Sequence, residues 1–392
     1  MICVLAQQGA PQGFSFENKI AAIMNACDKK RIPFKRVTSL DAAQELRVED
    51  EVISIVVMGF SSRWIFSIVE KARSLGGFKV IVAGNHSIPS YMGLFSGVSY
   101  DMSMALTDVF TYLDNYKKTN VAVYGISPSV EEEVAAANLT VKFMPWRRCD
   151  GEQVFPLYTT LSDCWQSFSV SMGNFNAVIC PNDLVAISLM QHIKAYRPSK
   201  LHDIFIVSLQ EAVLGKIYSP GVTTLSCDIN RFAEEILQIH SSPKSAACQV
   251  FLNRTLNVGA STGNQPVIQP SRLFSYSEMV SENIITFDSP VIQVAPDTEY
   301  IEVQKLNKLF TGCNDYELGL LIILLERENY NDMANLMGTN PETVKYYIRK
   351  CFMRAGLKNK VELKNILEKY LTARDLRRYR VACGGSNSRK SR

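Results

Sequence analysis

The sequence predicts an α/β protein with parallel sheets over residues 1–270, followed by a small all-α domain towards the carboxyl end. Two observations lead to this prediction. In the first part, short apolar runs alternate with helical patterns of about 10–15 residues, which is typical of βαβ units. In the second part, two helical patterns meet at a glycine turn, and lysine and arginine become frequent.

The first part contains a series of apolar runs that predict strands buried on both faces of parallel sheets. These runs cover residues 2–6, 52–58, 79–83, 121–124, 177–180 and 204–208, and the helical patterns between them include residues 16–30, 64–75, 104–116 and 183–195. In open α/β sheets, ligands bind beyond the carboxyl ends of the strands. The sequence therefore predicts a ligand site where the strand ends meet, near residues 7–8, 59–63, 85–86, 125–129, 181–183 and 208–211.

Four stretches of this part resemble the effector-binding module of lac-repressor-type regulators. They are residues 176–186 (NAVICPNDLVA), Val222-Thr223-Thr224 with Asp228, Ser99-Tyr100-Asp101, and residues 254–262. That family shares its fold with periplasmic sugar-binding proteins. The resemblance implies a two-lobed, periplasmic-binding-protein-like sensor, with one lobe formed by residues 1–100 and 229–260 and the other by residues 101–228.

The same resemblance implies which residues bind an effector. Asn182 stands where the family places an amide that binds a sugar hydroxyl, and Gln210 stands where an aspartate is usual. Asn85 and Arg63 follow other predicted strands and complete the candidate effector set. An amide holds neighbouring hydroxyls less well than a carboxylate does, so the ligand is left open as a sugar, another small molecule or none. Asp183 is equally expected to cap its helix.

A helix pair is predicted at residues 329–357. The first helix, over residues 330–337, runs into Gly338, which can adopt the positive φ of a tight turn. Asn340 then provides an N-cap, and Pro341 takes the first position of the second helix. The second helix has an apolar stripe formed by Val344, Ile348, Cys351, Phe352 and Ala355. Its opposite arc is cationic and carries Tyr346, Arg349, Lys350 and Met353, with Lys345 and Arg354 on its margins.

This stretch resembles the C-terminal DNA-binding domain of the LuxR type. Asp332-Met333-Ala334 stands at that family's Glu-Ile-Ala, Thr343-Val344-Lys345 matches its Thr-Val-Lys, and Gly356-Leu357 matches the exit of its recognition helix. A preceding helix over residues 314–328 starts with Asn314 and Glu317 at capping-box spacing. The resemblance implies that the second helix enters the major groove of double-stranded DNA. The residues expected to contact DNA are Thr343, Lys345, Tyr346, Arg349 and Lys350. The pattern by itself equally fits an ordinary helical hairpin with a solvated charged face.

The resemblances and the composition together divide the chain. Residues 305–371 are predicted to form the helix-turn-helix domain. Residues 271–304 form an ordered linker, and residues 303–310 form a lead-in helix. The basic tail, residues 372–392, begins with arginines that are expected to extend the last helix.

Charge is distributed unevenly along the chain. Residues 340–392 contain 15 lysines and arginines against 4 aspartates and glutamates, whereas residues 1–300 contain 24 against 28. A basic end on an acidic body indicates a polyanionic partner for that end only. The ten cysteines form no CxxC pair, which predicts reduced thiols in a cytoplasmic protein. The absence of a run of about 18 apolar residues predicts no membrane contact.

The sequence gives little support to an enzyme. Its four histidines show no metal-ligand spacing, and there is no GxGxxG, Walker or GxSxG motif. We therefore expect no catalytic residue, no metal and no cofactor. The acidic residues 131–133 are expected to form a solvated face.

Two functions remain for comparison with the structure. The first is a one-component transcription regulator, a cytoplasmic homodimer whose affinity for DNA is controlled by a small-molecule effector, with a sugar or sugar-like compound expected. The second is a solute-sensing adaptor whose basic C-terminal domain contacts a protein.

Overall fold

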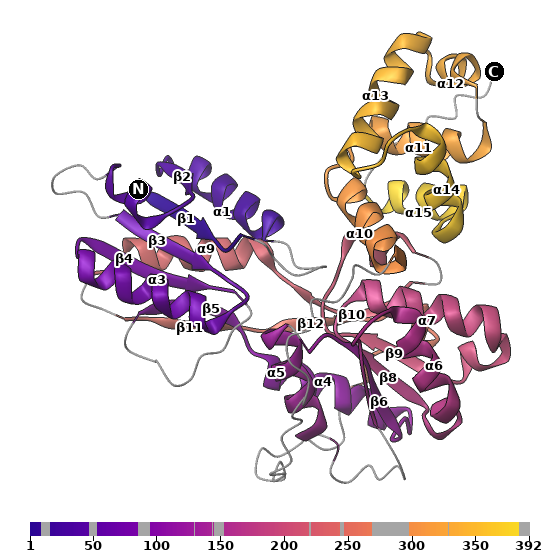
Figure 1. Cartoon of the computed structure of the whole chain (residues 1–392), viewed down its shortest axis with the longest axis horizontal. Coiled ribbons are helices and arrows are strands. Elements are labelled where there is room, and N and C mark those ends of the chain that lie inside the picture. Colours follow the sequence, from indigo (N-terminus) through magenta and orange to yellow (C-terminus); the bar gives the residue numbers. More distant parts are fainter. Residues whose placement is uncertain are drawn as a thin grey trace.

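The chain forms two α/β lobes and a C-terminal helical unit (Figure 1). The computed structural model describes residues 1–8, 16–46, 53–84, 95–128, 130–142, 144, 153–218, 221–243, 247–268, 298–327 and 329–383. Each lobe is built on a six-stranded sheet, and helices cover both faces of each sheet. The predicted fold class, two lobes with parallel sheets and an added helical part, is confirmed.

The first lobe contains a wholly parallel sheet in the order β11-β5-β4-β3-β1-β2. Its strands are β1 (Ile2–Ala6), β2 (Phe34–Val37), β3 (Ile53–Met58), β4 (Phe78–Ala83), β5 (Ser96–Tyr100) and β11 (Gln249–Leu252). Helices α1 (Glu17–Lys30) and α9 (Ile229–Ser241) cover one face. Helices α2 (Leu40–Gln44) and α3 (Ser62–Leu75) cover the other. Since both faces are covered, β3 and β4 are buried at every residue, as their continuous apolar runs require.

The second lobe repeats this plan in the order β12-β10-β9-β8-β6-β7. Its strands are β6 (Val121–Ile126), β7 (Val154–Pro156), β8 (Ala177–Cys180), β9 (Phe205–Ser208), β10 (Thr223–Cys227) and β12 (Arg254–Asn257). Helices α4 (Met102–Asn115) and α5 (Glu131–Lys142) pack on one face. Helices α6 (Leu161–Ser171), α7 (Asp183–Tyr196) and α8 (Val213–Ile217) pack on the other. Among the described residues of this lobe, 3₁₀ turns lie at Met172–Asn174, Pro198–His202 and Ala260–Thr262.

The chain crosses between the lobes at Asp101, Asp228 and Asn253. Asp101 and Asp228 each cap the helix that follows, because their carboxylates accept from the free amides of the first turn. The third crossing corrects the predicted lobe boundary. Residues 254–257 do not end the first lobe, because β12 pairs antiparallel with β10 and the Arg254 guanidinium donates to the Leu209 carbonyl oxygen at 2.6 Å.

The C-terminal helical unit comprises α10 (Thr298–Thr311), α11 (Asp315–Glu326), α12 (Tyr330–Met337), α13 (Pro341–Arg354), α14 (Lys360–Tyr370) and α15 (Ala373–Ala382). Residues 298–304 of the predicted linker belong to α10, which starts earlier than the expected lead-in helix. Its remainder, residues 271–297, and residues 384–392 of the predicted tail lie outside the described residues. The arginines after Leu371 do not extend α14, because Thr372 and Asp375 form a capping box that begins a new helix.

Helix α11 lies at the centre of the helical unit and holds α13 in place. The predicted capping box is confirmed, since Asn314 Oδ1 accepts from the Glu317 amide at 2.8 Å and the Asn314 amide donates to the Glu317 carboxylate at 3.1 Å. The Glu317 side chain is fully buried and also accepts from Lys350 Nζ at 3.0 Å and Arg354 Nη2 at 2.9 Å. Burial by itself raises the pKa of Glu317, but the hydrogen bonds from Lys350, the Asn314 amide and Arg354 outweigh it, so the pKa lies below its usual value.

We expect Glu317→Ala to destabilise the protein by about 2 kcal/mol, because two cations on α13 lose the carboxylate that neutralises them. This figure is below the full cost of breaking a buried pair, since the side chains of Lys350 and Arg354 are 47% and 18% exposed. The depressed pKa also means that this stabilisation is present above the carboxylate's unfolded-state pKa and is lost as the pH falls through the folded-state value. Urea unfolding across acidic pH measures both effects.

Glu342→Ala is the matched control for this experiment. Glu342 also pairs with a lysine of α13, Lys345, at 2.7 Å, but its side chain is 80% exposed. Its loss should change the free energy of unfolding by less than about 0.5 kcal/mol. Equal destabilisation by the two substitutions would show that Glu317 does not hold α13.

Candidate DNA interface and effector pocket

The turn between α12 and α13 has the geometry that the sequence predicts. Gly338 ends α12 with φ of 65°, a left-handed conformation that glycine adopts without strain. Asn340 Oδ1 accepts from the Thr343 amide at 2.8 Å, and Pro341 occupies the first turn of α13. These local interactions fix where α13 begins and which of its faces turns inward.

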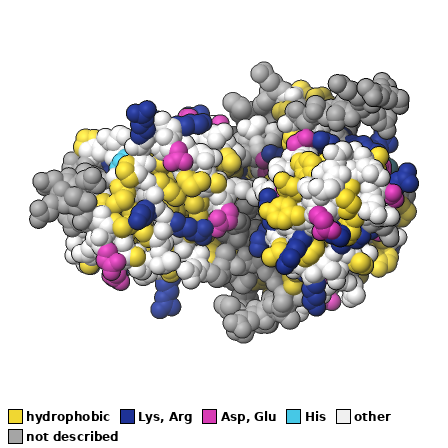
Figure 2. Space-filling model, turned by 90° about the horizontal axis from the view of Figure 1, so that it is seen from above, with side chains coloured by type: hydrophobic (Ala, Val, Ile, Leu, Met, Phe, Trp, Pro, Cys, Tyr) yellow, Lys and Arg dark blue, Asp and Glu magenta, His cyan; other side chains and the backbone are white. Residues whose placement is uncertain are grey.

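The predicted apolar stripe of α13 packs inward and leaves the cationic arc outside. Val344, Ile348 and Cys351 are fully buried, whereas Lys345, Tyr346, Arg349 and Lys350 are exposed. Of the residues predicted to contact DNA, Thr343 alone is half-buried; it lies in the first turn. Figure 2 shows Lys and Arg side chains spread over the helical-unit face that is uppermost in Figure 1. The arc is therefore accessible to a large partner.

Two lysines of this arc differ in their ion pairs. Lys345 pairs with the exposed Glu342 one turn away, an interaction that a phosphate can replace at little cost. Lys350 pairs with the buried Glu317 and lies 5.8 Å from the ring centre of Tyr347. Lys350 therefore has a structural role in addition to any contact with a ligand.

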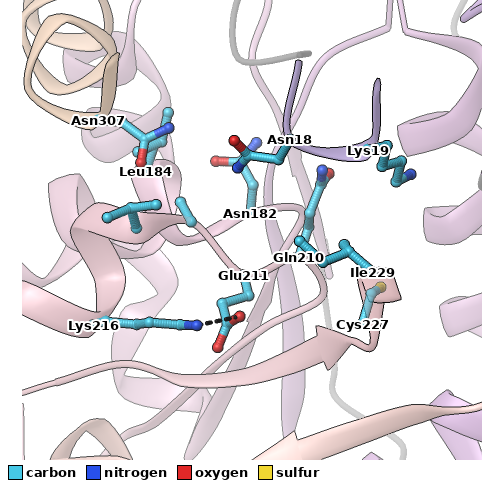
Figure 3. A pocket seen from close by; sticks show the side chains of 12 residues that line it. Asn18, Lys19, Asn182, Leu184, Gln210, Glu211, Lys216, Cys227, Ile229 and Asn307 are labelled. Atoms are coloured by element: carbon cyan, nitrogen blue, oxygen red, sulfur yellow. Dashed lines mark ion pairs between the residues drawn. The ribbon is translucent and has the colours of Figure 1, made fainter. Parts of the chain in front are cut away.

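A pocket of about 320 Å³ lies where the two lobes and the helical unit meet (Figure 3). We call it the junction pocket. Its lining residues are Asn18, Lys19, Asn182, Leu184, Gln210, Glu211, Ala212, Val213, Lys216, Cys227, Ile229 and Asn307. Its volume is near the lower end of the usual range for small-molecule sites.

The structure brings two of the four predicted effector residues together at the junction pocket. Asn182 and Gln210 both line it. Asn182 also caps α7, and its Nδ2 donates to Glu133 at 3.3 Å and to the Tyr300 hydroxyl at 3.5 Å. Arg63 is exposed on α3 and does not line the pocket. Asn85 lies outside the described residues.

Several pocket residues were not predicted from the sequence. Asn18 and Lys19 lie in the first turn of α1, and the signal that could have found them is their place at the start of the helix that follows the first strand. Asn307 comes from α10 in the helical unit, and no local sequence signal links that helix to the pocket. Lys216 and Glu211 form an ion pair of 2.9 Å on the pocket wall.

The acidic residues 131–133 are not simply a solvated face, which corrects the sequence-based expectation. The Glu131 carboxylate accepts from the Ser62 amide at 2.9 Å and from the Ser61 hydroxyl at 3.3 Å. Because Glu131 belongs to the second lobe and both serines begin α3 of the first, these two bonds form a clasp between the lobes. Glu133 accepts from the Ser127 amide at 2.8 Å and lies beside Asn182.

Helix α10 connects the junction pocket to α13. On the lobe side, Glu299 accepts from Ser188 at 2.6 Å and contacts His192 at 3.2 Å, and Asn307 Oδ1 accepts from the Leu214 amide at 3.1 Å. On the other side, the Leu309 carbonyl oxygen accepts from Arg354 of α13 at 3.4 Å. The same helix therefore contacts the pocket wall and the helix that carries the cationic arc.

Asp183 lies behind the pocket wall without solvent access. Its Oδ2 accepts from the Ala212 amide at 2.8 Å, while its Oδ1 has no hydrogen-bond partner among the described residues. Burial raises the pKa of this carboxyl to about 7, although the Ala212 amide lowers it. A side chain at Gly215 would overlap the carboxylate, with its Cβ 1.9 Å from Oδ2. The packing thus favours glycine at position 215 and a neutral carboxyl group on Asp183.

The described residues contain no group of three or more His, Cys, Asp or Glu that could hold a metal ion. No helix in the described ranges is both long and apolar enough to cross a membrane.

We expect Asp183→Asn to stabilise the protein more at pH 8.5 than at pH 5.5. A raised folded-state pKa means that the neutral carboxyl contributes stability below the unfolded-state pKa, and this contribution is lost as the pH rises through about 7. The asparagine variant does not ionise and avoids that loss. Melting temperatures of the two proteins across this range measure the difference.

Asp203→Asn serves as the matched control, because the Asp203 side chain is 60% exposed and pairs with Lys200 on the surface. Its melting temperature should follow that of the wild type at every pH. A constant difference between wild type and Asp183→Asn across the pH range would contradict the assigned ionisation.

Comparison with solved structures identifies the fold. A LacI-family transcriptional regulator from Silicibacter pomeroyi matches with a TM-score of 0.51 and 12% identity, over 68% of this chain and 100% of that one. The regulator CcpA from Weissella paramesenteroides with bound sucrose matches with a TM-score of 0.50 and 14% identity, over 68% and 100%. CcpA of Lactococcus lactis gives 0.50 and 12%, over 67% and 98%. No protein-family model and no curated protein matches the sequence. The chain thus has the two-lobed fold seen in LacI-family regulators, followed by its own helical unit.

Proposed function

We propose that this protein is a DNA-binding transcription regulator controlled by a small molecule that binds in the junction pocket. Its C-terminal helical unit acts as a LuxR-type helix-turn-helix domain and binds double-stranded DNA. The effector is a sugar or a sugar-like compound, and the protein acts in the cytoplasm as a homodimer. It is not an enzyme.

The arrangement of α12 and α13 is the observation that supports DNA binding most directly. A helix of this size fits the major groove, and its exposed arc presents Lys345, Tyr346 and Arg349. Lysine and arginine neutralise phosphates, and arginine also reads guanine edges. The glycine turn before α13 and Gly356 after it, with φ of 67°, stand where the LuxR-type pattern has its turn and its exit.

The junction pocket supports control by a small molecule. Solved structures with the same fold include LacI-family regulators with bound sucrose, glucose or ribose. A ligand that binds one lobe arrangement better than another shifts the population towards that arrangement. In a homodimer, such a shift changes the distance between two α13 helices, which must be about one DNA turn apart to read a palindrome.

The second candidate is an adaptor whose helical unit binds a protein. Exposed apolar side chains favour it, because Leu336 of α12 and Met353 of α13 are 63% and 62% exposed. Apolar side chains increase affinity for a protein surface, whereas affinity for a phosphate backbone depends on positive charge. Salt dependence separates the two candidates.

We expect Arg349→Ala and Lys345→Ala each to weaken binding of the full-length protein to double-stranded DNA. Each substitution should also reduce the slope of log affinity against log salt by about one, because one phosphate contact is lost. Retention on immobilised DNA across a salt series measures both quantities.

Lys194→Ala is the matched control, since Lys194 is an exposed lysine of α7 outside the helical unit. It should leave the slope unchanged. Lys350→Ala should reduce the slope less than Arg349→Ala and also lower the melting temperature, because Lys350 neutralises Glu317. DNA retention that does not respond to salt, or responds equally in all four variants, would refute DNA binding by α13 and favour the adaptor.

A further inference from the structure

We propose that Asn307 of α10 is part of the effector site, so that a neutral, hydroxyl-rich ligand binds both lobes and the helical unit at once. This inference rests on the proposed function and deepens it. It means that the helical unit contacts the ligand directly, since one residue that lines the pocket belongs to that unit.

The position of Asn307 is the first step of the argument. Asn307 lines the junction pocket opposite Asn18 and Lys19 of the first lobe (Figure 3). Its Oδ1 accepts from the Leu214 amide at 3.1 Å, which fixes the orientation of the carboxamide. Its Nδ2 makes no hydrogen bond to another residue that the structure describes and remains available to an acceptor in the pocket.

The packing of α10 is the second step. Tyr300, Val303, Leu306 and Phe310 are buried and belong to one hydrophobic core together with residues of α7 and α8. The interactions of Glu299 with Ser188 and His192 fix the start of the helix as well. Asn307 is therefore held at the pocket by a packed helix.

The lining of the pocket indicates the class of ligand. Carboxamides come from all three bodies, namely Asn18, Asn182, Gln210 and Asn307. An amide both donates and accepts, which suits the hydroxyls of a small sugar. The charged groups already have partners. Lys216 pairs with Glu211 at 2.9 Å, and Lys19 Nζ lies 5.4 Å from the ring centre of Tyr100. An ionic ligand would have to replace these interactions, whereas a neutral one leaves them in place.

The geometry also gives the direction of the effect. The pocket is formed while α10 is packed against α7 and α8, so a ligand gains its contact with Asn307 only in this arrangement. Binding therefore stabilises the docked position of α10. Because Leu309 of the same helix holds Arg354 of α13, the ligand also restricts the recognition helix.

The test measures the affinity of the full chain for D-glucose and D-ribose by calorimetry and by the rise in melting temperature. We expect at least one of them to bind the wild type. Asn307→Ala should weaken that binding about tenfold, the usual effect of losing one well-placed hydrogen bond. Lys308→Ala, an exposed neighbour on α10, should leave the affinity unchanged. Ser188→Ala loosens the start of α10 outside the pocket and should change it by less than about twofold.

Each other outcome overturns the proposal. Equal affinity of wild type and Asn307→Ala shows that α10 does not contact the ligand. An equal loss of affinity in Ser188→Ala shows that both substitutions loosen the docking of α10, and that Asn307 need not contact the ligand. If neither sugar binds, or if D-glucose 6-phosphate binds as tightly as glucose, the ligand class is wrong. DNA retention is measured separately on the same variants without sugar. A wild type that binds sugar through Asn307 but not DNA would refute the proposed function and leave this inference intact.

Discussion

The hydrophobic contact between α10 and the second lobe determines how the rest of the molecule is arranged. Five buried apolar side chains of α10 belong to the same hydrophobic core as the residues of α7 and α8. Burial of apolar area of this kind is the dominant stabilising contribution in protein interiors. The polar contacts around it, at Glu299, Tyr300 and Asn307, fix the orientation of α10 on the second lobe, because hydrogen bonds are directional. As a result, α10 is a firmly packed helix that contacts both the pocket wall and α13.

Local signals in the sequence were sufficient for much of the fold. The helix at Tyr330–Met337, its glycine end and the Asn340 cap lie where the sequence predicts them, because caps and turns depend on residues two to four positions apart. The same holds for the Asn314–Glu317 capping box and for the apolar strands. The inward stripe of α13 followed from helical periodicity.

Features that depend on contacts between residues far apart in the chain could not be predicted from local sequence signals. Nothing near residue 131 shows that its carboxylate meets the first turn of a helix in the other lobe. Likewise, Asn307 reaches the pocket only because a helix almost 100 residues downstream of Leu214 packs there. The sequence analysis placed the residues of β12 in the first lobe, whereas β12 pairs with β10 of the second. The lobe that a strand joins depends on its pairing partner, which its own residues do not specify.

The Glu131 clasp has a consequence for the speed with which the molecule can respond. Any separation of the lobes must break its two hydrogen bonds to α3, which together contribute on the order of 1–3 kcal/mol. If a solute enters and leaves only through the separated form, the clasp slows its association and its dissociation in proportion to the rarity of that form, by roughly 5- to 150-fold, and leaves the equilibrium affinity of the clasped form unchanged. A single surface carboxylate would therefore set the response time of such a sensor, and substitutions there would tune that time without altering any residue that lines the junction pocket.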